Sequence, residues 1–262
     1  MDGRSAAWSL IALSAFGVAE LASAEVVESE KPERRDESRV GIGARAAWVP
    51  EFPGSDSGEM LVLPAFDISY GRLFVNADGL GVRLMDRNGW AVSASLSADL
   101  LHRKESDAPH LAGTGDIDRT VVAILKGTYR FDAWQLAVAL INDVADEGHG
   151  TAAELSLLRS MPLTRRLSLH GGAVVRWIDD EHAETFFGID AEQSALSGLP
   201  IYSAGNGLAE ARVFLRANYA LERRWILSAG ATWSELQGDV ADSPIVEQDG
   251  ALSLDATLIY RF

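Results

Sequence analysis

The chain has 262 residues, no cysteine and a formal net charge of −15. The lack of cysteine excludes disulfides and thiolate metal sites, and the negative charge argues against nucleic-acid binding through a basic surface. Hydrophobic residues make up 47% of the chain, yet its mean hydropathy is only +0.03. Polar residues must therefore interrupt the apolar ones regularly.

Residues 1–24 have the three parts of a secretory signal peptide. Arg4 gives a positive start, residues 6–19 form an apolar run, and residues 22–24 (ASA) form a small-x-small cleavage site. The run is too short for a helix across a bilayer, which needs about 20 residues. We expect a cleaved signal peptide rather than a buried amphipathic helix, so the protein is exported. Residues 25–39, dense in both charge signs, are expected to form a flexible periplasmic lead-in.

In residues 40–262, apolar and polar side chains alternate with a period of two, which predicts β-strands. Several alternating runs, such as 90–99 and 167–178, have ten to twelve residues. A tilted membrane strand needs ~9–11 residues, whereas strands of soluble sheets usually have ~5–6. We therefore favour an all-β fold, a transmembrane antiparallel β-barrel of the bacterial outer membrane, over a soluble sandwich that buries its apolar face.

The aromatic residues are distributed as in a membrane barrel. Their rings favour the boundary between bilayer and water, and barrels carry a girdle of them at each rim. In a soluble core, tryptophan would more often lie in the middle of a strand. Every tryptophan after the signal peptide instead lies at or near the end of an expected strand: Trp48, Trp90, Trp134, Trp177, Trp225 and Trp233.

The connections from residue 90 onward alternate between short and long, which is typical of short periplasmic turns and long external loops. Residues 61–85 contain breaks at Gly71 and at residues 77–79, which favour three shorter strands over one kinked strand. The count is then twelve strands, with ten as the alternative, because bacterial barrels are usually even-numbered.

The terminal strand, residues 251–262, is expected to close the barrel with its apolar face toward lipid. Phe262 would then lie at the periplasmic rim. The terminal aromatic residues, Tyr260 and Phe262, resemble the signal that the barrel-insertion machinery of Gram-negative outer membranes reads.

Charged residues on the strands are expected to face the lumen, because charges inside a membrane barrel must pair or be wet. Both signs occur, so they form either a network that blocks the lumen or the lining of a narrow pore. We favour a largely blocked lumen because many of these side chains are long arginines. The expected lumen charge network is Arg45, Asp67, Asp99, Lys126, Glu154, Arg176, Arg212, Arg216 and Asp255.

Two groups of histidines are candidates for chemistry. Ser168 and His170 share the lumen face, but no carboxylate that would orient the histidine can be identified, so polar lumen lining is favoured over catalysis. The histidines and aspartates of residues 102–118 match no zinc spacing, and we expect a solvated loop there. We expect no enzyme activity, no cofactor and no metal.

The two ends of the barrel differ in charge. The external loop 179–209 has six carboxylates and no lysine or arginine, whereas the periplasmic turns are basic. The acidic loops either serve solubility alone or attract cations, including divalent ions that bridge to lipopolysaccharide phosphates. The arginine pairs Arg165, Arg166 and Arg223, Arg224 are candidates for contact with a periplasmic partner.

Several segments together resemble the MipA/OmpV family of outer-membrane proteins. The segments are "PEFPGSDS", "LPAFDISYGRLFV", "GTGDIDRTV", the long block from "FFGIDAEQSALSGLP" to "DSPIVEQDG", and the terminal "YRF". The order of the segments and the long block carry the resemblance, since a short motif such as "GDID" is weak. Phe52 and Pro53 depart from the family pattern, where a tyrosine is expected nearby.

The resemblance implies a non-enzymatic barrel in the outer membrane of a Gram-negative bacterium, with no catalytic residues to transfer. It also implies a scaffold role for murein enzymes, namely a lytic transglycosylase and, through it, a penicillin-binding protein. Outer-membrane lipid and lipopolysaccharide would be its other contacts. The alternatives are a narrow small-solute or cation-attracting channel and, as a minor one, a lipid-modifying barrel enzyme.

Overall fold

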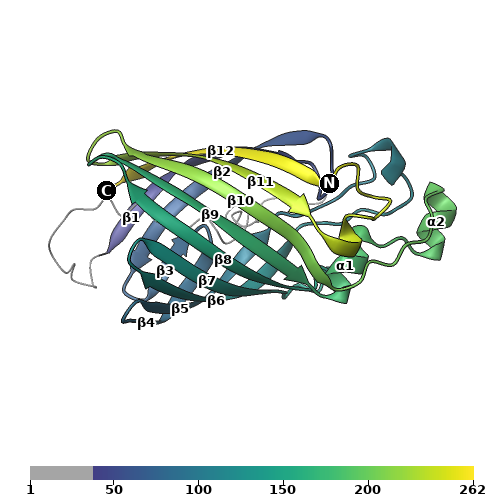
Figure 1. Cartoon of the computed structure of the whole chain (residues 1–262), viewed down its shortest axis with the longest axis horizontal. Helices are drawn as coiled ribbons and strands as arrows, with labels where there is room; N and C mark the ends of the chain where they lie inside the picture. Colours follow the sequence, from purple (N-terminus) through teal and green to yellow (C-terminus); the bar gives the residue numbers. More distant parts are fainter. Residues whose placement is uncertain (1–37) are drawn as a thin grey trace, which may run out of the picture.

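Twelve antiparallel strands form a closed barrel in this computed structural model, which describes residues 38–262 (Figure 1). The expected twelve-strand membrane barrel is confirmed. The signal peptide and nearly all of the lead-in lie outside the described residues. The strands are β1 (Arg39–Pro50), β2 (Gly58–Tyr70), β3 (Leu73–Asn76), β4 (Gly79–Arg87), β5 (Trp90–Asp99), β6 (Thr120–Phe131), β7 (Trp134–Asp143), β8 (Thr151–Pro162), β9 (Leu167–Ile178), β10 (Gly207–Ala220), β11 (Trp225–Leu236) and β12 (Gly250–Arg261).

The terminal strand closes the ring, because β12 pairs with β1 in a register that sets Ala44 opposite Leu258. A Cβ atom on Gly43 would lie 1.8 Å from the carbonyl oxygen of Leu258, so only glycine allows this close approach. The last residue also takes part, since the N–H of Phe262 donates to the carbonyl of Val40 at 2.9 Å. The C-terminal residue is therefore hydrogen-bonded to β1 at the barrel seam.

The outer surface of the barrel is apolar and carries aromatic rings at two levels. Trp48 pairs with Leu254 toward the end with the long loops, and Trp225 pairs with Tyr260 near the C-terminus. The rings of Trp225 and Tyr260 are 5.0 Å apart. Trp225 is the first residue of β11 and Trp233 lies near its other end, so the two are separated by ~27 Å along the strand at ~3.4 Å per residue. After strand tilt, this span is close to the ~25 Å apolar band of outer-membrane barrels.

The segment between residues 58 and 87 contains the three strands that the breaks predict. The turn at Gly71 separates β2 from β3, and a second turn at Ala77 and Asp78 separates β3 from β4. The strand β3 has only four residues, so it pairs with no more of β2 than residues 68–70. The barrel wall is therefore short at this position.

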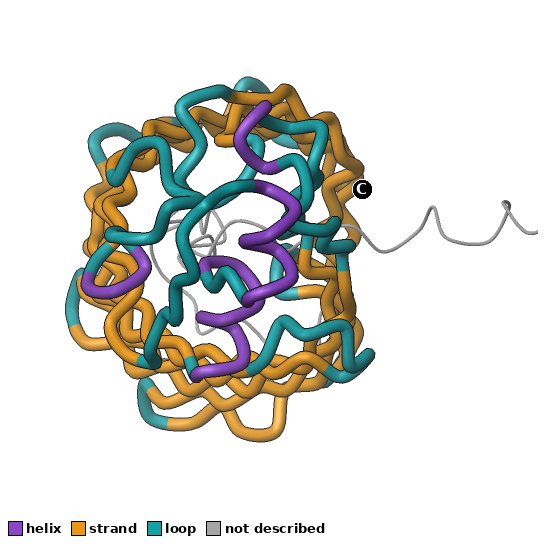
Figure 2. The backbone as a smooth tube through the Cα atoms, turned by 90° about the vertical axis from the view of Figure 1, so that its right-hand side faces the viewer, coloured by secondary structure: helices purple, strands orange, loops and turns teal. Residues whose placement is uncertain are grey.

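The end of the barrel that carries the long loops is covered. Figure 2 shows that helices and loops lie across the opening of the ring of strands. The sequence predicted only an irregular loop between β9 and β10, but this loop contains the helices α1 (Asp180–Phe187) and α2 (Ala191–Ser197). Their N-caps are Asp179 and Asp190, whose side chains accept hydrogen bonds from helix N–H groups. Neither these helices nor any other in the described residues has the length and hydrophobicity to cross a membrane.

Apolar side chains fix these loops to one another, so they form a plug rather than a solvated fringe. We call the covering loops, residues 100–119, 144–150, 179–206 and 237–249, the plug. Phe186 and Phe187 of α1 pack with Ile178 of β9 and Val240 in one buried cluster. A second cluster joins three of these loops to the loop between β1 and β2 through buried apolar side chains: Phe52, Ala108, Leu111, Ile189 and Ile245.

Candidate functional site

The lumen below the plug contains carboxylates that are each flanked by two arginines. Asp67 of β2 lies 2.8 Å from Arg39 Nη2 and 3.2 Å from Arg261 Nη2. Asp255 of β12 lies 2.8 Å from Arg216 Nη2 and 3.5 Å from Arg45 Nη2. In both clusters one negative charge links strands on either side of the seam.

Glu154 of β8 is the centre of the third cluster and is only 1% exposed. Its Oε1 accepts hydrogen bonds from Arg212 of β10 and, at 3.3 Å, from Arg176 of β9. Arg212 Nε also lies 3.5 Å from Glu210 Oε2. A buried carboxylate held by two guanidinium groups is stable only with such good pairing. Charged side chains therefore occupy lumen space that water or solutes would otherwise fill.

The remaining two residues of the expected network each contact a residue outside it. Lys126 Nζ lies 3.0 Å from Asp78 in the turn between β3 and β4. Asp99, at the end of β5, lies 3.1 Å from Nδ1 of His149 in the plug. Within residues 38–262, ion pairs group the expected residues around Asp67, Asp255 and Glu154, with Lys126 paired to Asp78 and Asp99 to His149.

Five members of these clusters were not among the expected residues. Alternation gave a signal for two of them, because it placed Arg261 on the same face as Asp255 and Glu210 on the same face as Arg212. The other three lie where alternation gives no information, at a strand start, in a turn or in a loop: Arg39, Asp78 and His149.

Buried polar groups connect the plug to the barrel. His149 Nε2 lies 2.8 Å from the carbonyl of Asp118, and its own carbonyl lies 2.7 Å from His182 Nδ1. Burial opposes the charged form of His149, but the hydrogen bond and charge of Asp99, the carbonyl of Asp118 and the charge of Asp143 together outweigh it, and the pKa of His149 is raised. Burial, reinforced by Arg176, lowers the pKa of His182 to about 4. The two histidines therefore favour opposite protonation states.

The histidines that were considered for chemistry are held by other contacts. His170 is buried, and its ring nitrogens contact the hydroxyls of Ser160 at 3.0 Å and Ser168 at 3.1 Å. In the plug, His102 faces Glu59 at 3.9 Å and His110 faces Glu247 at 3.3 Å. Within residues 38–262, no group of three or more side chains is arranged to hold a metal ion.

The opposite end of the barrel, which carries the C-terminus, has a compact basic rim. The arginine pairs are exposed and lie on two turns, residues 163–166 and 221–224. These turns are adjacent, because the N–H of Ala220 donates to the carbonyl of Arg166 at 2.8 Å. The second turn contacts the terminal strand, since Arg261 N–H donates to the carbonyl of Arg224 at 2.7 Å. We call the exposed residues Arg165, Arg166, Arg223 and Arg224 the basic rim.

Comparison with known proteins gives one family match and similar full-length relatives. The family described as MltA-interacting protein MipA matches residues 42–262. The protein YiaT of Escherichia coli K12, which is named as an outer membrane protein, is 25% identical over 228 residues, 86% of this chain and 92% of YiaT. The MltA-interacting protein of the same strain is 22% identical over 253 residues, 95% of this chain and 98% of that protein.

Among solved structures, an outer membrane channel from Pseudomonas putida F1 is similar with a TM-score of 0.46 and 9% sequence identity. The match covers 89% of this chain and 100% of the channel. The NanC porin matches with a TM-score of 0.37 and 10% identity, over 84% of this chain and 98% of the porin. At these scores the two structures carry no argument about function.

Proposed function

Because this chain belongs to the family of the MltA-interacting protein MipA, we propose that it is a scaffold that holds a lytic transglycosylase at the periplasmic face of the outer membrane. The chain itself is an outer-membrane β-barrel protein. The family match over residues 42–262 carries the proposal, since a relative of nearly equal length is named for this interaction. A penicillin-binding protein would join the assembly through the transglycosylase.

The basic rim supports this function because a murein enzyme can reach only the periplasmic side of the barrel. Four exposed arginines on two adjacent turns give a local positive charge on a protein whose net charge is −15. The turns are short and rigid, so an interface built on them alone would be small and weak. We expect the lead-in to add a second attachment, which makes binding depend on both parts and on salt.

The plug and the buried lumen charges favour a scaffold over the alternative of a narrow channel. A solute that entered from outside would meet the apolar clusters of the plug and then the cluster around Glu154. Both would have to move before the lumen conducts. A third class, a lipid-modifying enzyme, finds little support at His170, whose ring nitrogens hydrogen-bond only to hydroxyls among the described side chains.

The experiment that tests the scaffold is capture of a purified lytic transglycosylase by the barrel in detergent, with crosslinking and in rising salt. The test variant combines Arg165→Gln, Arg166→Gln, Arg223→Gln and Arg224→Gln, and we expect it to lose at least tenfold in capture. A matched control carries Arg72→Gln and Arg87→Gln, which are exposed on periplasmic turns elsewhere on the rim. Equal capture by the wild type and the four-arginine variant would show that the basic rim is not the binding site.

A variant that lacks residues 28–38 tests the lead-in in the same assay. If the barrel without residues 28–38 and without the four arginines still captured the enzyme, the periplasmic-face scaffold would be wrong. Correct insertion of each variant is checked by the slower migration of the unfolded barrel after heating.

A further inference from the structure

Most of strand β2 has a strand neighbour on one side only. β1 pairs with β2 along its full length, but β3 pairs only with residues 68–70 because the β3–β4 hairpin turns back at Ala77 and Asp78. On the other side of the hairpin, β4 pairs with β5 no further than Leu96. Above the hairpin, the described chain therefore places no strand between residues 58–67 and the end of β5. The short β3 and β4 are visible at the periplasmic half of the barrel in Figure 1.

This unpaired edge lies at the level of the outer leaflet. Met60 is directly opposite Trp48, which belongs to the aromatic level near the long loops, and Val62 just below it is 71% exposed. Open strand edges do not face lipid unless their polar groups line a cavity in the protein or reach water. Pro64 has no N–H and prevents another strand from pairing along this edge. The edge is therefore an opening in the wall rather than a docking site for a strand.

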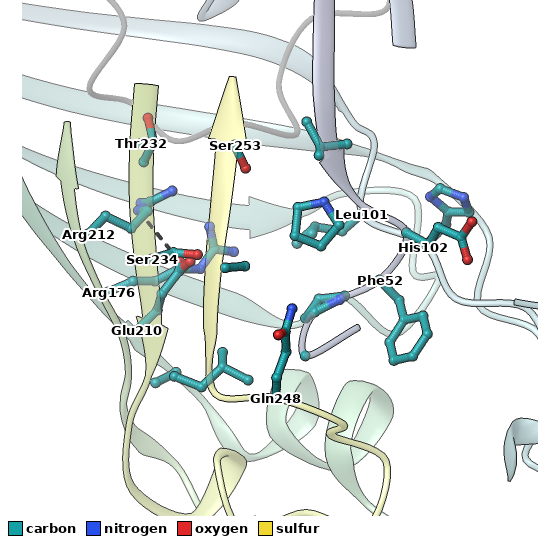
Figure 3. Close-up of a pocket in the computed structure, with 18 of the residues that line it drawn as sticks. Phe52, Leu101, His102, Arg176, Glu210, Arg212, Thr232, Ser234, Gln248 and Ser253 are labelled. Carbon is teal, nitrogen blue, oxygen red and sulfur yellow. Dashed lines mark ion pairs between the residues drawn. The ribbon is translucent and has the colours of Figure 1, made fainter. Parts of the chain in front are cut away.

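A cavity lies in the lumen behind the edge (Figure 3). The cavity has a volume of about 130 Å³. An apolar protein cavity of about 150 Å³ is large enough to bind benzene, so this one can take a short stretch of hydrocarbon. The cavity is bounded on one side by Leu61 of β2 and by Leu100 and Leu101, which directly follow β5.

The opposite wall of the cavity is polar. Figure 3 shows Arg212 and Glu210 across the cavity from Leu101 and His102. Hydroxyl groups of β11 and β12, from Thr232, Ser234 and Ser253, complete this wall. The cavity thus has an apolar side next to the opening and a polar side deeper in the lumen.

Strand β2 is apolar on both faces beside the opening. Lumen-facing positions in membrane barrels are usually polar, but the inward positions of β2 are apolar at Leu61, Leu63 and Ala65. The outward positions Met60 and Val62 are apolar as well. The inward Val122 and Ile124 of β6 are apolar too, but they pack with Ala139 in a buried cluster. Leu61 of β2 instead lines the cavity, so the inner face of β2 can contact hydrocarbon there.

The contact that spans the opening is weak. Within residues 38–262, the upper part of β2 and the chain that follows β5 share no backbone hydrogen bond. They meet at the ion pair of His102 Nε2 and Glu59 Oε1, at 3.9 Å. Both side chains lie at the edge of the cavity. A long, partly exposed pair of this kind can separate without breaking any strand pairing.

From these observations we propose that the cavity binds a single-chain amphiphile, which enters from the outer leaflet through the opening between β2 and the end of β5. The acyl chain lies against Leu61, Leu100 and Leu101, and the head group reaches the polar wall. The head group is zwitterionic, because the cavity lining has Arg176 and Arg212 but also Glu51, Glu59, Glu210 and Asp249. A fatty-acid anion would meet more carboxylates than arginines there.

The test uses a lysophosphatidylcholine that carries a photoreactive diazirine on its acyl chain, in vesicles that contain the wild-type barrel. After illumination, mass spectrometry is expected to find the label on Leu61, Leu100 or Leu101. Label on the outer surface alone, at residues such as Val62, would overturn the proposal. If laurate that carries a diazirine labelled the cavity leucines as strongly as the lysophosphatidylcholine probe, the assignment of a zwitterionic head group would be overturned.

Two matched variants of β12 separate binding in the cavity from contact with bulk lipid. Ser253→Trp fills the cavity, whereas Leu254→Trp adds the same bulk one residue further on the lipid face. We expect Ser253→Trp to reduce labelling of the cavity leucines at least tenfold and Leu254→Trp to leave it unchanged. Ala251→Trp, which also fills the cavity, replaces Ser253→Trp if that variant does not fold. Unchanged labelling in the filled cavity would contradict the proposal.

The route is tested by the pair that spans the opening. Glu59→Gln with His102→Gln removes the ion pair and should increase the rate of cavity labelling several-fold. The control is Glu247→Gln with His110→Gln, which removes a similar ion pair between two plug loops and leaves Glu59 and His102 unchanged. If the control pair accelerated labelling and the Glu59–His102 pair did not, the amphiphile would enter through the plug, and the lateral route would be wrong.

Discussion

Arg216 and Asp255 form an ion pair across the strand that separates them. Arg216 is on β10 and Asp255 is on β12, and Gly230 of β11 is directly opposite both residues. Because Gly230 has no side chain, Arg216 Nη2 reaches Asp255 Oδ1 at 2.8 Å. A Cβ atom on Gly230 would lie 2.9 Å from Asp255 Oδ1 and 3.1 Å from Arg216 Nη2. The glycine is therefore required for a contact between second-neighbour strands.

We predict that Gly230→Val destabilises the barrel because it separates this pair and leaves a buried carboxylate with poorer contacts. The expected loss is roughly 1–3 kcal/mol, the range for a buried polar group that loses a partner. The measurement is urea unfolding in detergent, followed by the change in gel mobility. Gly127→Val is the control, since a Cβ atom there meets nothing within 4 Å. A similar loss in both variants would show that β-strand glycine replacement, and not the ion pair, is responsible.

Glu154→Gln is expected to be the more harmful lumen substitution. It leaves Arg176 and Arg212 without the carboxylate that both contact, and removal of one partner from a buried pair typically costs about 3–5 kcal/mol. Glu235→Gln on the same barrel removes an exposed carboxylate and should change stability by less than about 0.5 kcal/mol. If Glu154→Gln unfolded at the same urea concentration as the wild type, the cluster would contribute no stability.

The two buried histidines predict how the plug responds to acid. The pKa of His182 is about 4 in the fold against 6.5 when unfolded, so its contribution is present above pH 6.5 and is lost as the pH falls toward 4. This gap corresponds to roughly 3 kcal/mol at ~1.4 kcal/mol per pH unit. The pKa of His149 is raised, so its contribution has the opposite sign: it is present below pH 6.5 and is lost as the pH rises through the folded value.

We therefore expect His182→Gln to reduce the acid sensitivity of the plug and His149→Gln to increase it. The readout is protease cleavage of the plug loops between pH 7 and 4 while the barrel remains folded. Asp99 and Arg176 remain in place in both variants, so a difference between the variants reports the histidines themselves. The same pH profile for both variants would show that neither histidine controls the plug.

The barrel could be predicted in detail because its strands are long and alternate strictly. Gly71 and the turn at residues 77–79 even located the short strand β3. The plug could not be predicted, since Phe186 meets Val240, and Ile189 meets Ile245, only through the tertiary arrangement of separate loops. Alternation predicted that the charges of the lumen clusters face the lumen, but it did not predict which charges form ion pairs. Arg216 reaches Asp255 across Gly230 of the intervening strand, and pairing rules for directly adjacent strands do not identify such a contact.

The orientation of the barrel gives the last prediction, and the plug determines which residues can report it. The chain has no cysteine, so single cysteines give no background with a membrane-impermeant thiol reagent. Leu196 on α2 is 69% exposed, and we expect Leu196→Cys to be labelled on intact cells. Glu222→Cys, on an exposed turn at the other end, should be labelled only after the outer membrane is permeabilised.

Ser243→Cys provides the internal control, because Ser243 is in a plug loop but is only 4% exposed and donates to the carbonyl of Phe187 at 2.6 Å. This cysteine should stay unlabelled on intact cells and react after the plug is opened by urea. Labelling of Ser243→Cys without urea would show that the plug is open in the membrane. Labelling of Glu222→Cys but not Leu196→Cys on intact cells would reverse the orientation, and the basic rim would then face away from the periplasm and from any murein enzyme.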